Sequence, residues 1–217
     1  MPLRADHTIA ALAVALGGPP ALVLLSKAWF GDAPSLGIAV ALQVVYCGLA
    51  AFVIWIVLTK EKLPLTSIGL RRPRWSTFVM ALALWIVSLN LLPWALRPLR
   101  DAVAASPNEG LPSLLALPQW FRLILAITGG IVEEVLYRGY AIERLTTLTG
   151  RRWLGAMIAA AAFGLAHAPY WGLSYALVAD LPFGIVATLF YVWRRDLVAN
   201  ILAHDAGLIV GVLSLPH

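Results

Sequence analysis

Two adjacent glutamates, Glu133 and Glu134, lie in a run of residues that otherwise has the composition of a membrane-spanning helix. The run extends from Phe121 to Arg138. A charged side chain near the centre of such a helix costs roughly 2.5–3.5 kcal/mol on insertion scales. Two neighbouring carboxylates therefore need polar partners at the same depth, and the default interpretation of such residues is a functional one.

The apolar character extends over the whole chain. Its 217 residues are 61% hydrophobic and 12% charged, and the mean hydropathy is +0.84. Soluble domains carry about 25% charged residues. The sequence therefore predicts an all-α, polytopic transmembrane helical bundle of about seven to eight spans, a multi-pass protein of the cell (inner) membrane in contact with the lipid bilayer. The length suits a single membrane domain over residues 1–217.

The net charge of +5 does not indicate a nucleic-acid partner. The basic residues cluster in short loops between apolar stretches, as the positive-inside rule requires of a membrane protein. The single cysteine, Cys47, lies in an apolar run. One cysteine excludes an intrachain disulfide and a cysteine-based metal cluster, so we expect a structural thiol.

Seven apolar stretches approach the ~20 residues that a span requires. They are Ile9–Phe30, Leu36–Leu58, Trp75–Leu96, Trp120–Tyr140, Trp153–Ala168, Leu173–Trp193 and Leu197–Leu215. The basic residues concentrate before the first stretch and in every second connection after it. That alternation predicts a cytoplasmic N-terminus. The segment Pro98–Pro118 leaves room for an eighth, re-entrant or split segment.

Helix geometry gives the two glutamates different roles. Glu134 and Arg138 are four residues apart, so they share a helix face and can form an ion pair. Glu133 is rotated by about 100° and has no local cation. A buried carboxylate without a counter-ion becomes a stronger base, which suits general-base catalysis.

The chain also predicts which helices meet at Glu133. Gly150, beside Arg151 and Arg152, marks a tight turn. Glu133 precedes it by the same number of residues by which His167 follows it. In an antiparallel helical hairpin the two side chains therefore lie opposite each other, ~25 Å from the turn.

Further polar residues occur in the later stretches. His204 shares a helix face with Asn200 and Leu208, and Phe163 shares one with His167. Either histidine alone could equally be a packing residue, but the two together with the glutamates favour one polar pocket. For Asp180, satisfying freed backbone groups near Pro182 or lining a cavity is favoured over catalysis. Asp205 could orient a histidine or face water.

These residues resemble the motifs of the CPBP intramembrane proteases, which include the CAAX prenyl endopeptidases and the abortive infection proteins. Glu133-Glu134-Val-Leu-Tyr-Arg138 is similar to the family's Glu-Glu-x-x-x-Arg motif, and Phe163-Gly-Leu-Ala-His167 to its Phe-x-x-x-His motif. The segment Gly184 to His204 resembles the approach to the last motif. The resemblance covers roughly residues 115–215, a CPBP-like catalytic core, whereas residues 1–110 match only as hydrophobic spans.

The resemblance implies an intramembrane endopeptidase that cleaves a peptide or membrane-protein substrate. Glu133 and His167 would activate water, His204 would stabilise the oxyanion, and Glu134 and Arg138 would support the site. The cofactor is left open between none and a divalent metal such as zinc. If a metal is present, its ligands would be Glu133, His167 and His204, although the sequence lacks the His-Glu-x-x-His spacing of common zinc proteases.

One departure from the family pattern bears on activity. The family has a polar residue four positions after the last histidine, and this chain has Leu208. Asn200 or Asp205 could replace it, although from different directions. The departure keeps open a non-enzymatic immunity or scaffold protein with a degenerate site. A small transporter or proton pathway is less favoured, because the chain has no inverted repeat.

Overall fold

The computed structural model describes residues 5–103 and 110–216, and within them every regular element is helical. The α-helices are α1 (Ala5–Phe30), α2 (Leu36–Trp55), α3 (Trp75–Ile86), α4 (Leu92–Ala95), α5 (Arg97–Val103), α6 (Leu111–Leu115), α7 (Gln119–Glu133), α8 (Glu143–Thr149), α9 (Arg152–Ala166), α10 (Ala168–Trp171), α11 (Leu173–Tyr175), α12 (Leu181–Arg194) and α13 (Leu197–Leu213). Wider or tighter helical turns connect several of them: η1 (Ile56–Lys60), η2 (Leu65–Ile68), η3 (Val87–Leu91), η4 (Glu134–Ile142) and η5 (Ala176–Asp180).

Five helical stretches of the described residues are long and apolar enough to cross a membrane. They are Asp6–Phe30, Leu36–Lys60, Trp75–Ala95, Arg152–Trp171 and Leu173–Arg194, and they coincide with five of the seven expected spans. The expected span Leu197–Leu215 corresponds to the shorter apolar helix Leu197–Leu213. The all-α membrane bundle predicted from the sequence is therefore confirmed.

The remaining expected span, Trp120–Tyr140, differs from the structure. Residues 119–149 form one continuous helical stretch through α7, η4 and α8, and it carries the charged residues of the motif. It is not among the five stretches that are long and apolar enough to cross a membrane. The segment 98–118, where an eighth span was considered, contains only the short helices α5 and α6 in its described part.

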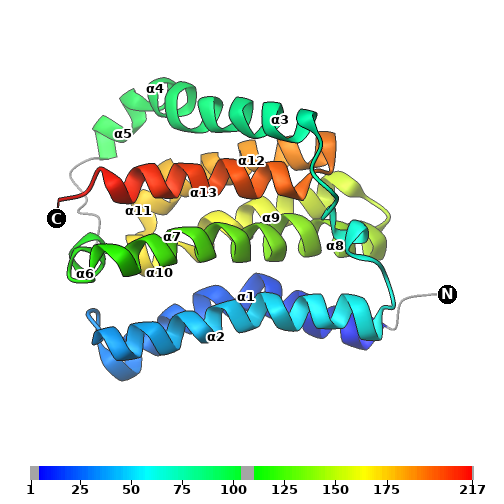
Figure 1. Cartoon of the computed structure of the whole chain (residues 1–217), viewed down its shortest axis with the longest axis horizontal. Helices are drawn as coiled ribbons and strands as arrows, with labels where there is room; N and C mark the ends of the chain where they lie inside the picture. The colour runs from blue at the N-terminus through cyan, green and yellow to red at the C-terminus, as the bar shows by residue number, and fades with distance from the viewer. Residues whose placement is uncertain (1–4, 104–109, 217) are drawn as a thin grey trace.

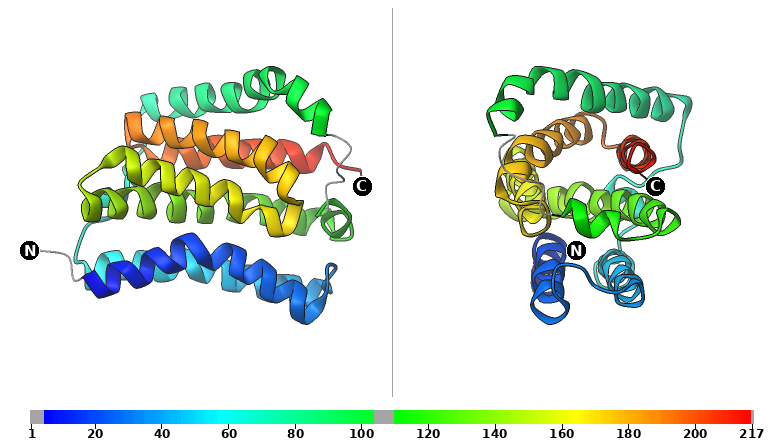
Figure 2. Two further views of the ribbon diagram at one scale, coloured as in Figure 1. Left: turned by 180° about the vertical axis from the view of Figure 1, so that it is seen from behind. Right: turned by 90° about the vertical axis from the view of Figure 1, so that its left-hand side faces the viewer.

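The helices lie roughly side by side in stacked tiers (Figures 1 and 2). The α1–α2 hairpin forms one outer tier and α3 the other, with α7, α9, α12 and α13 between them. The strongest contacts pair α9 with α12, and α13 with both α7 and α3. Small residues such as Ala81, Ala199 and Ala203 allow α3 and α13 to approach closely, as is usual between membrane helices.

The basic connections 60–74, 143–152 and 194–196 gather at one end of the bundle, which we call the basic end (Figure 1). Glu61 accepts hydrogen bonds from Thr8, Tyr140 and Arg144 there, and the Arg144 Nη2–Glu61 Oε2 distance is 2.7 Å. All four side chains are largely buried. Their hydrogen bonds join α1, the α2–α3 connection and the helical stretch formed by η4 and α8.

A second set of contacts closes the same end. Arg195 has a left-handed backbone (φ 50°), which is uncommon outside glycine, and its guanidinium binds both oxygens of Glu143 at 2.8 and 2.6 Å. Burial lowers the pKa of Arg195, but the hydrogen bonds and charge of Glu143 outweigh it and raise that pKa above its ordinary value. Asp196 caps α13 by accepting from the Ala199 backbone N–H and from Thr77.

The opposite end holds the α1–α2 loop and the short helices α5, α6, α10 and α11 (Figure 1). Gly31 and Gly172 adopt positive φ angles there, of 75° and 89°, which is the usual use of glycine at sharp reversals. The two ends therefore differ in construction: short helices and turns build this end, whereas the Arg144–Glu61 and Arg195–Glu143 ion pairs join the elements of the basic end.

Candidate active site

Glu133 is the last residue of α7, immediately before the chain widens into the π-helix η4. π-helical turns occur mostly as short insertions and are frequent at functional sites. Glu133 is 15% exposed in its side chain, whereas all nine residues of η4 are buried. The two adjacent glutamates therefore have different surroundings, as their helical offset predicted.

Tyr46 of α2 holds one oxygen of Glu133. Its hydroxyl donates to Glu133 Oε1 at 3.0 Å. The residue lies outside the motifs, and sequence analysis did not select it. Its only signal was a polar hydroxyl inside the apolar stretch Leu36–Leu58, which the usual enrichment of tyrosine at membrane interfaces makes easy to discount.

His167 faces the other oxygen of the same carboxylate. Its Nε2 lies 3.7 Å from Glu133 Oε2, and its Nδ1 lies 2.8 Å from the Phe163 carbonyl oxygen. A carbonyl can only accept, so Nδ1 carries a proton and Nε2 is the ring atom that faces Glu133. Gly150 does form a tight left-handed turn, so this approach agrees with the predicted hairpin register.

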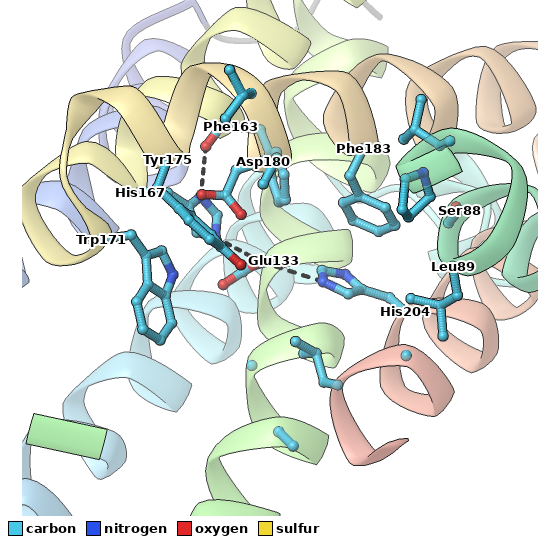
Figure 3. A pocket seen from close by; sticks show the side chains of 18 of the residues that line it. Ser88, Leu89, Glu133, Phe163, His167, Trp171, Tyr175, Asp180, Phe183 and His204 are labelled. Carbon is cyan, nitrogen blue, oxygen red and sulfur yellow. Dashed lines mark hydrogen bonds and ion pairs between the residues drawn. The ribbon is translucent and has the colours of Figure 1, made fainter. Parts of the chain in front are cut away.

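His204, on α13, faces Glu133 from a third helix. Its Nε2 lies 3.8 Å from Glu133 Oε2, and its Nδ1 lies 3.0 Å from Glu134 Oε1. The carboxylate of Glu134 accepts a hydrogen bond from Nδ1–H and thereby orients the ring. Both imidazoles are therefore held through Nδ1 by a second group, with Nε2 directed at the same Glu133 oxygen (Figure 3).

Glu134 and Arg138 form the ion pair expected from their spacing. The Arg138 Nη1–Glu134 Oε1 distance is 2.9 Å, and both side chains are completely buried. The guanidinium carbon also lies 3.9 Å from the centre of the Phe163 ring, a cation–π contact. Phe163 in turn packs against His167 and His204, with ring centres 4.7 and 6.1 Å away. The ion pair thus holds the Phe163 ring, and that ring in turn supports both histidines.

The three predicted catalytic side chains line one cavity of about 690 Å³, which we call the larger cavity. Its wall also includes Phe163, Asp180 and Leu208 (Figure 3 shows the part around Glu133). A smaller cavity of about 300 Å³ lies on the α1–α2 side and shares Glu133 and His167 with it. The structure therefore brings Glu133, His167 and His204 together in the larger cavity, and Glu133 and His167 also border the smaller one.

Asn200 and Asp205, the two candidates to replace the family's polar residue at position 208, do not line the cavity at Glu133. Asn200 is buried and donates from Nδ2 to the Ala187 carbonyl at 2.9 Å. Asp205 packs against Gly130, where a Cβ would collide with its carboxylate. Neither residue lines the larger cavity, whereas Leu208 does. The expectation that Asn200 or Asp205 replaces the family's polar residue therefore finds no support in the contacts of these two side chains.

Asp180 lies close to the Glu133 cluster. It ends the π-helix η5 directly before α12, and it lines the larger cavity with Glu133 and His167. Its Oδ2 atom is buried and has no hydrogen-bond partner. The expectation that it lines a cavity is confirmed by the cavity wall.

The side chains expected to hold a metal ion, if one is bound, are Glu133, His167 and His204. A catalytic zinc site requires three protein ligands and an open position. Among the residues that the structure describes, no group of three or more His, Cys, Asp or Glu side chains is arranged to hold a metal. The positions expected as ligands, Glu133, His167 and His204, form a cluster of one carboxylate and two imidazoles in this structure.

Comparison with known proteins supports the motif assignment. Residues 115–206 match the family model described as "Type II CAAX prenyl endopeptidase Rce1-like". The match confirms the resemblance to the CPBP proteases and, at the level of the family, supports a protease. No curated protein and no solved structure matches the chain. The matched segment contains every side chain of the site except Tyr46 and Leu208.

Proposed function

Proceeding from the Rce1-like match over residues 115–206, we propose that this chain is an intramembrane endopeptidase that hydrolyses a peptide bond with water activated by Glu133. The observation that carries the proposal is that the two oxygens of the Glu133 carboxylate have different contacts. Tyr46 binds Oε1, while Oε2 faces both imidazoles across 3.7–3.8 Å in an accessible cavity. Those gaps are too long for direct hydrogen bonds and leave Oε2 available to a water molecule.

In the first step, a water bound between Glu133 Oε2 and His167 Nε2 loses a proton to Glu133. The resulting hydroxide attacks the carbonyl carbon of the substrate peptide and forms a tetrahedral oxyanion. Both groups act as acceptors toward the water, because His167 keeps its proton on Nδ1 for the Phe163 carbonyl. The low dielectric of the site strengthens each of these hydrogen bonds.

In the second step, His204 stabilises the oxyanion. With Nδ1–H bound to Glu134, a protonated His204 offers Nε2–H to the developing negative charge. Protonated Glu133 then transfers its proton to the amide nitrogen, the C–N bond breaks, and a carboxylic acid and an amine leave. Glu134, paired with Arg138, fixes His204 and does not itself exchange a proton with substrate.

The test compares cells that express the wild-type chain with cells that express Glu133→Gln. Quantitative mapping of peptide termini in the membrane fraction should show cleavage products that disappear in the variant. Glu143→Gln is the matched control, because it makes the same change on the same continuous helix but at the Arg195 pair. Unchanged cleavage by Glu133→Gln, at equal protein level, would refute the role of Glu133.

Leu208 favours a second candidate function. It places an apolar side chain in the cavity wall where the family has a polar one. A non-enzymatic immunity or scaffold protein would keep the pocket for partner binding without turnover. That interpretation predicts that Glu133→Ala and His167→Ala both leave the cellular phenotype of the protein intact, whereas the protease loses it in both.

A further inference from the structure

Both cavities extend from Glu133 toward the same end of the bundle. The larger one runs along the first part of α7 to Arg122 and reaches Arg100 on α5 and Trp171 on α10. The smaller one runs between the α1–α2 hairpin and α7 to Asp32 and Ser113. No residue of the connections 60–74, 143–152 or 194–196 lines either cavity. Within the described residues, the route out of the site therefore leads to the opposite end and not to the basic end.

On the other side of Glu133 the bundle is filled with side chains. Leu136, Tyr140 and Ile142 of η4 are 0–1% exposed, as are Ile68 and Leu197 beside them. A Cβ at Gly139 would lie only 3.0 Å from both the Ile68 carbonyl and the Leu197 side chain, so even the backbone surfaces are in close contact. Beyond this layer, the Glu61 cluster and the Glu143–Arg195 pair close the end. An extended peptide would have to break this layer to reach Glu133.

The charges of the two ends differ in the way that orients membrane proteins. Exposed basic residues crowd the basic end: Lys60, Lys62, Arg71, Arg72, Arg74, Arg151, Arg152 and Arg194. The opposite end has few, and two of them pair with acids, Lys27 with Asp32 and Arg97 with Asp101. Because Lys and Arg in short loops are retained in the cytoplasm, the basic end is the cytoplasmic one.

From these observations together we infer that substrate and water reach Glu133 from the non-cytoplasmic side of the membrane. The substrate is then a polypeptide segment that has already crossed the membrane, or the part of a spanning segment that borders the far face. The inference rests on the proposed peptidase function. The physical reason is the filled basic end, since the backbone polar groups of a peptide forced into it would find neither water nor a hydrogen-bond partner.

The test measures from which side of the membrane the cavity can be reached, and it needs no substrate. The chain has one cysteine, so Cys47→Ser gives a background for single-cysteine variants. Leu208→Cys reports on the larger cavity, Asp32→Cys on the opposite end, and Thr147→Cys on an exposed position of the basic end. Intact cells are treated with a membrane-impermeant maleimide before and after permeabilisation.

The expected result is labelling of Leu208→Cys and Asp32→Cys in intact cells, and of Thr147→Cys only after permeabilisation. Labelling of Leu208→Cys only after permeabilisation, or of Thr147→Cys in intact cells, overturns the inference. Because the readout needs no turnover, it is separate from the proposed function. A catalytically inert protein can still show outward access, and an active one can fail this test.

Discussion

Two polar clusters lie on either side of the buried π-helix η4, and they differ in how completely their groups are paired. In the Glu61 cluster, Thr8, Tyr140 and Arg144 approach the carboxylate to 2.7–2.9 Å. In the Glu133 cluster, two imidazoles stop at 3.7 and 3.8 Å, and Asp180 next to them has a buried oxygen without a partner. The first cluster is saturated, whereas the second has room for water and substrate.

Under the proposed function, the difference separates a structural cluster from a reactive one. A buried charge that is fully hydrogen-bonded costs little further and fixes the helices around it. A charge left partly unpaired beside a cavity is costly unless something else binds there. The structural cluster is therefore identified by short distances, and the reactive one by long distances around an accessible oxygen.

The largest expected effect comes from Glu133→Gln. The amide keeps the shape and the contact with Tyr46 but removes the base. Because a positioned general base contributes about 10²–10⁴-fold, we expect peptide cleavage to fall by that factor while the unfolding midpoint changes little. Single-turnover cleavage by purified protein measures it. A fall in the cleavage rate of less than tenfold would contradict the role of Glu133 as the general base, and with it the distinction between a reactive and a structural cluster.

The saturated cluster should respond in stability instead. Arg144→Met leaves Glu61 as a buried carboxylate without its cation, which should lower the free energy of unfolding by about 3–5 kcal/mol. Cleavage per folded molecule should stay near the wild-type value. Denaturant titration in detergent measures the first quantity and active-site-normalised kinetics the second.

The double variant Glu61→Leu/Arg144→Met is the control, since apolar replacement of both partners is often close to neutral. It should recover most of the lost stability. If Arg144→Met abolished cleavage at full stability, the division of the molecule into a structural and a reactive cluster would be wrong.

Sequence reasoning predicted that Glu133, His167 and His204 lie together, but not what surrounds them. Motif spacing and the turn at Gly150 placed Glu133 opposite His167, because helical rise depends only on residue count. The widening of the helix at η4 was not predicted, since the residues of Glu134–Ile142 have no distinctive propensity for a π-helix. Tyr46 was missed for a different reason: its contact joins residues 87 positions apart, and no local pattern records such a contact.

The same limit explains the basic residues. The positive-inside pattern treated Arg144 and Arg195 as loop charges, whereas both are bound to acids that sequence analysis did not select, Glu61 and Glu143. Charge pattern gives the end of the bundle at which an arginine lies. Only packing shows whether that arginine is solvated or paired.

Tyr46→Phe should give a smaller effect than loss of the base. Hydrogen bonds to charged groups contribute about 1.5–3 kcal/mol, so kcat should fall by about 10–100-fold with little change in KM. A packing role alone would instead lower the free energy of unfolding, which denaturant titration of the variant measures. The matched control is Tyr137→Phe, whose buried hydroxyl has no hydrogen-bond partner.

Leu208→Asn tests the apolar part of the reactive cluster. A preorganised amide at an oxyanion is worth about 10²–10³-fold, and an amide placed without further optimisation should recover only part of it, about tenfold. Leu208→Ala, which opens the same space without a donor, controls for cavity size. Equal rates in both variants would show that position 208 does not reach the oxyanion, and a chain inactive in all three forms would favour the scaffold function.

The smallest expected effect is that of metal removal. The proposed steps assign every proton to a side chain: Glu133 accepts one from water, His204 donates a hydrogen bond to the oxyanion, and both histidines keep their Nδ1 protons, which they donate in hydrogen bonds to the Phe163 carbonyl and to Glu134. Dialysis against a strong chelator should therefore leave the cleavage rate within twofold of the untreated enzyme, and metal analysis should show much less than one equivalent of zinc. Glu133→Gln protein, analysed in parallel, separates an adventitious ion from a ligand, because a metal held by Glu133 would be lost from the variant. A chelated enzyme that loses activity and regains it with zinc would show instead that the two imidazoles and the carboxylate close around an ion, and the long distances of the reactive cluster would then mark a metal position and not a water position.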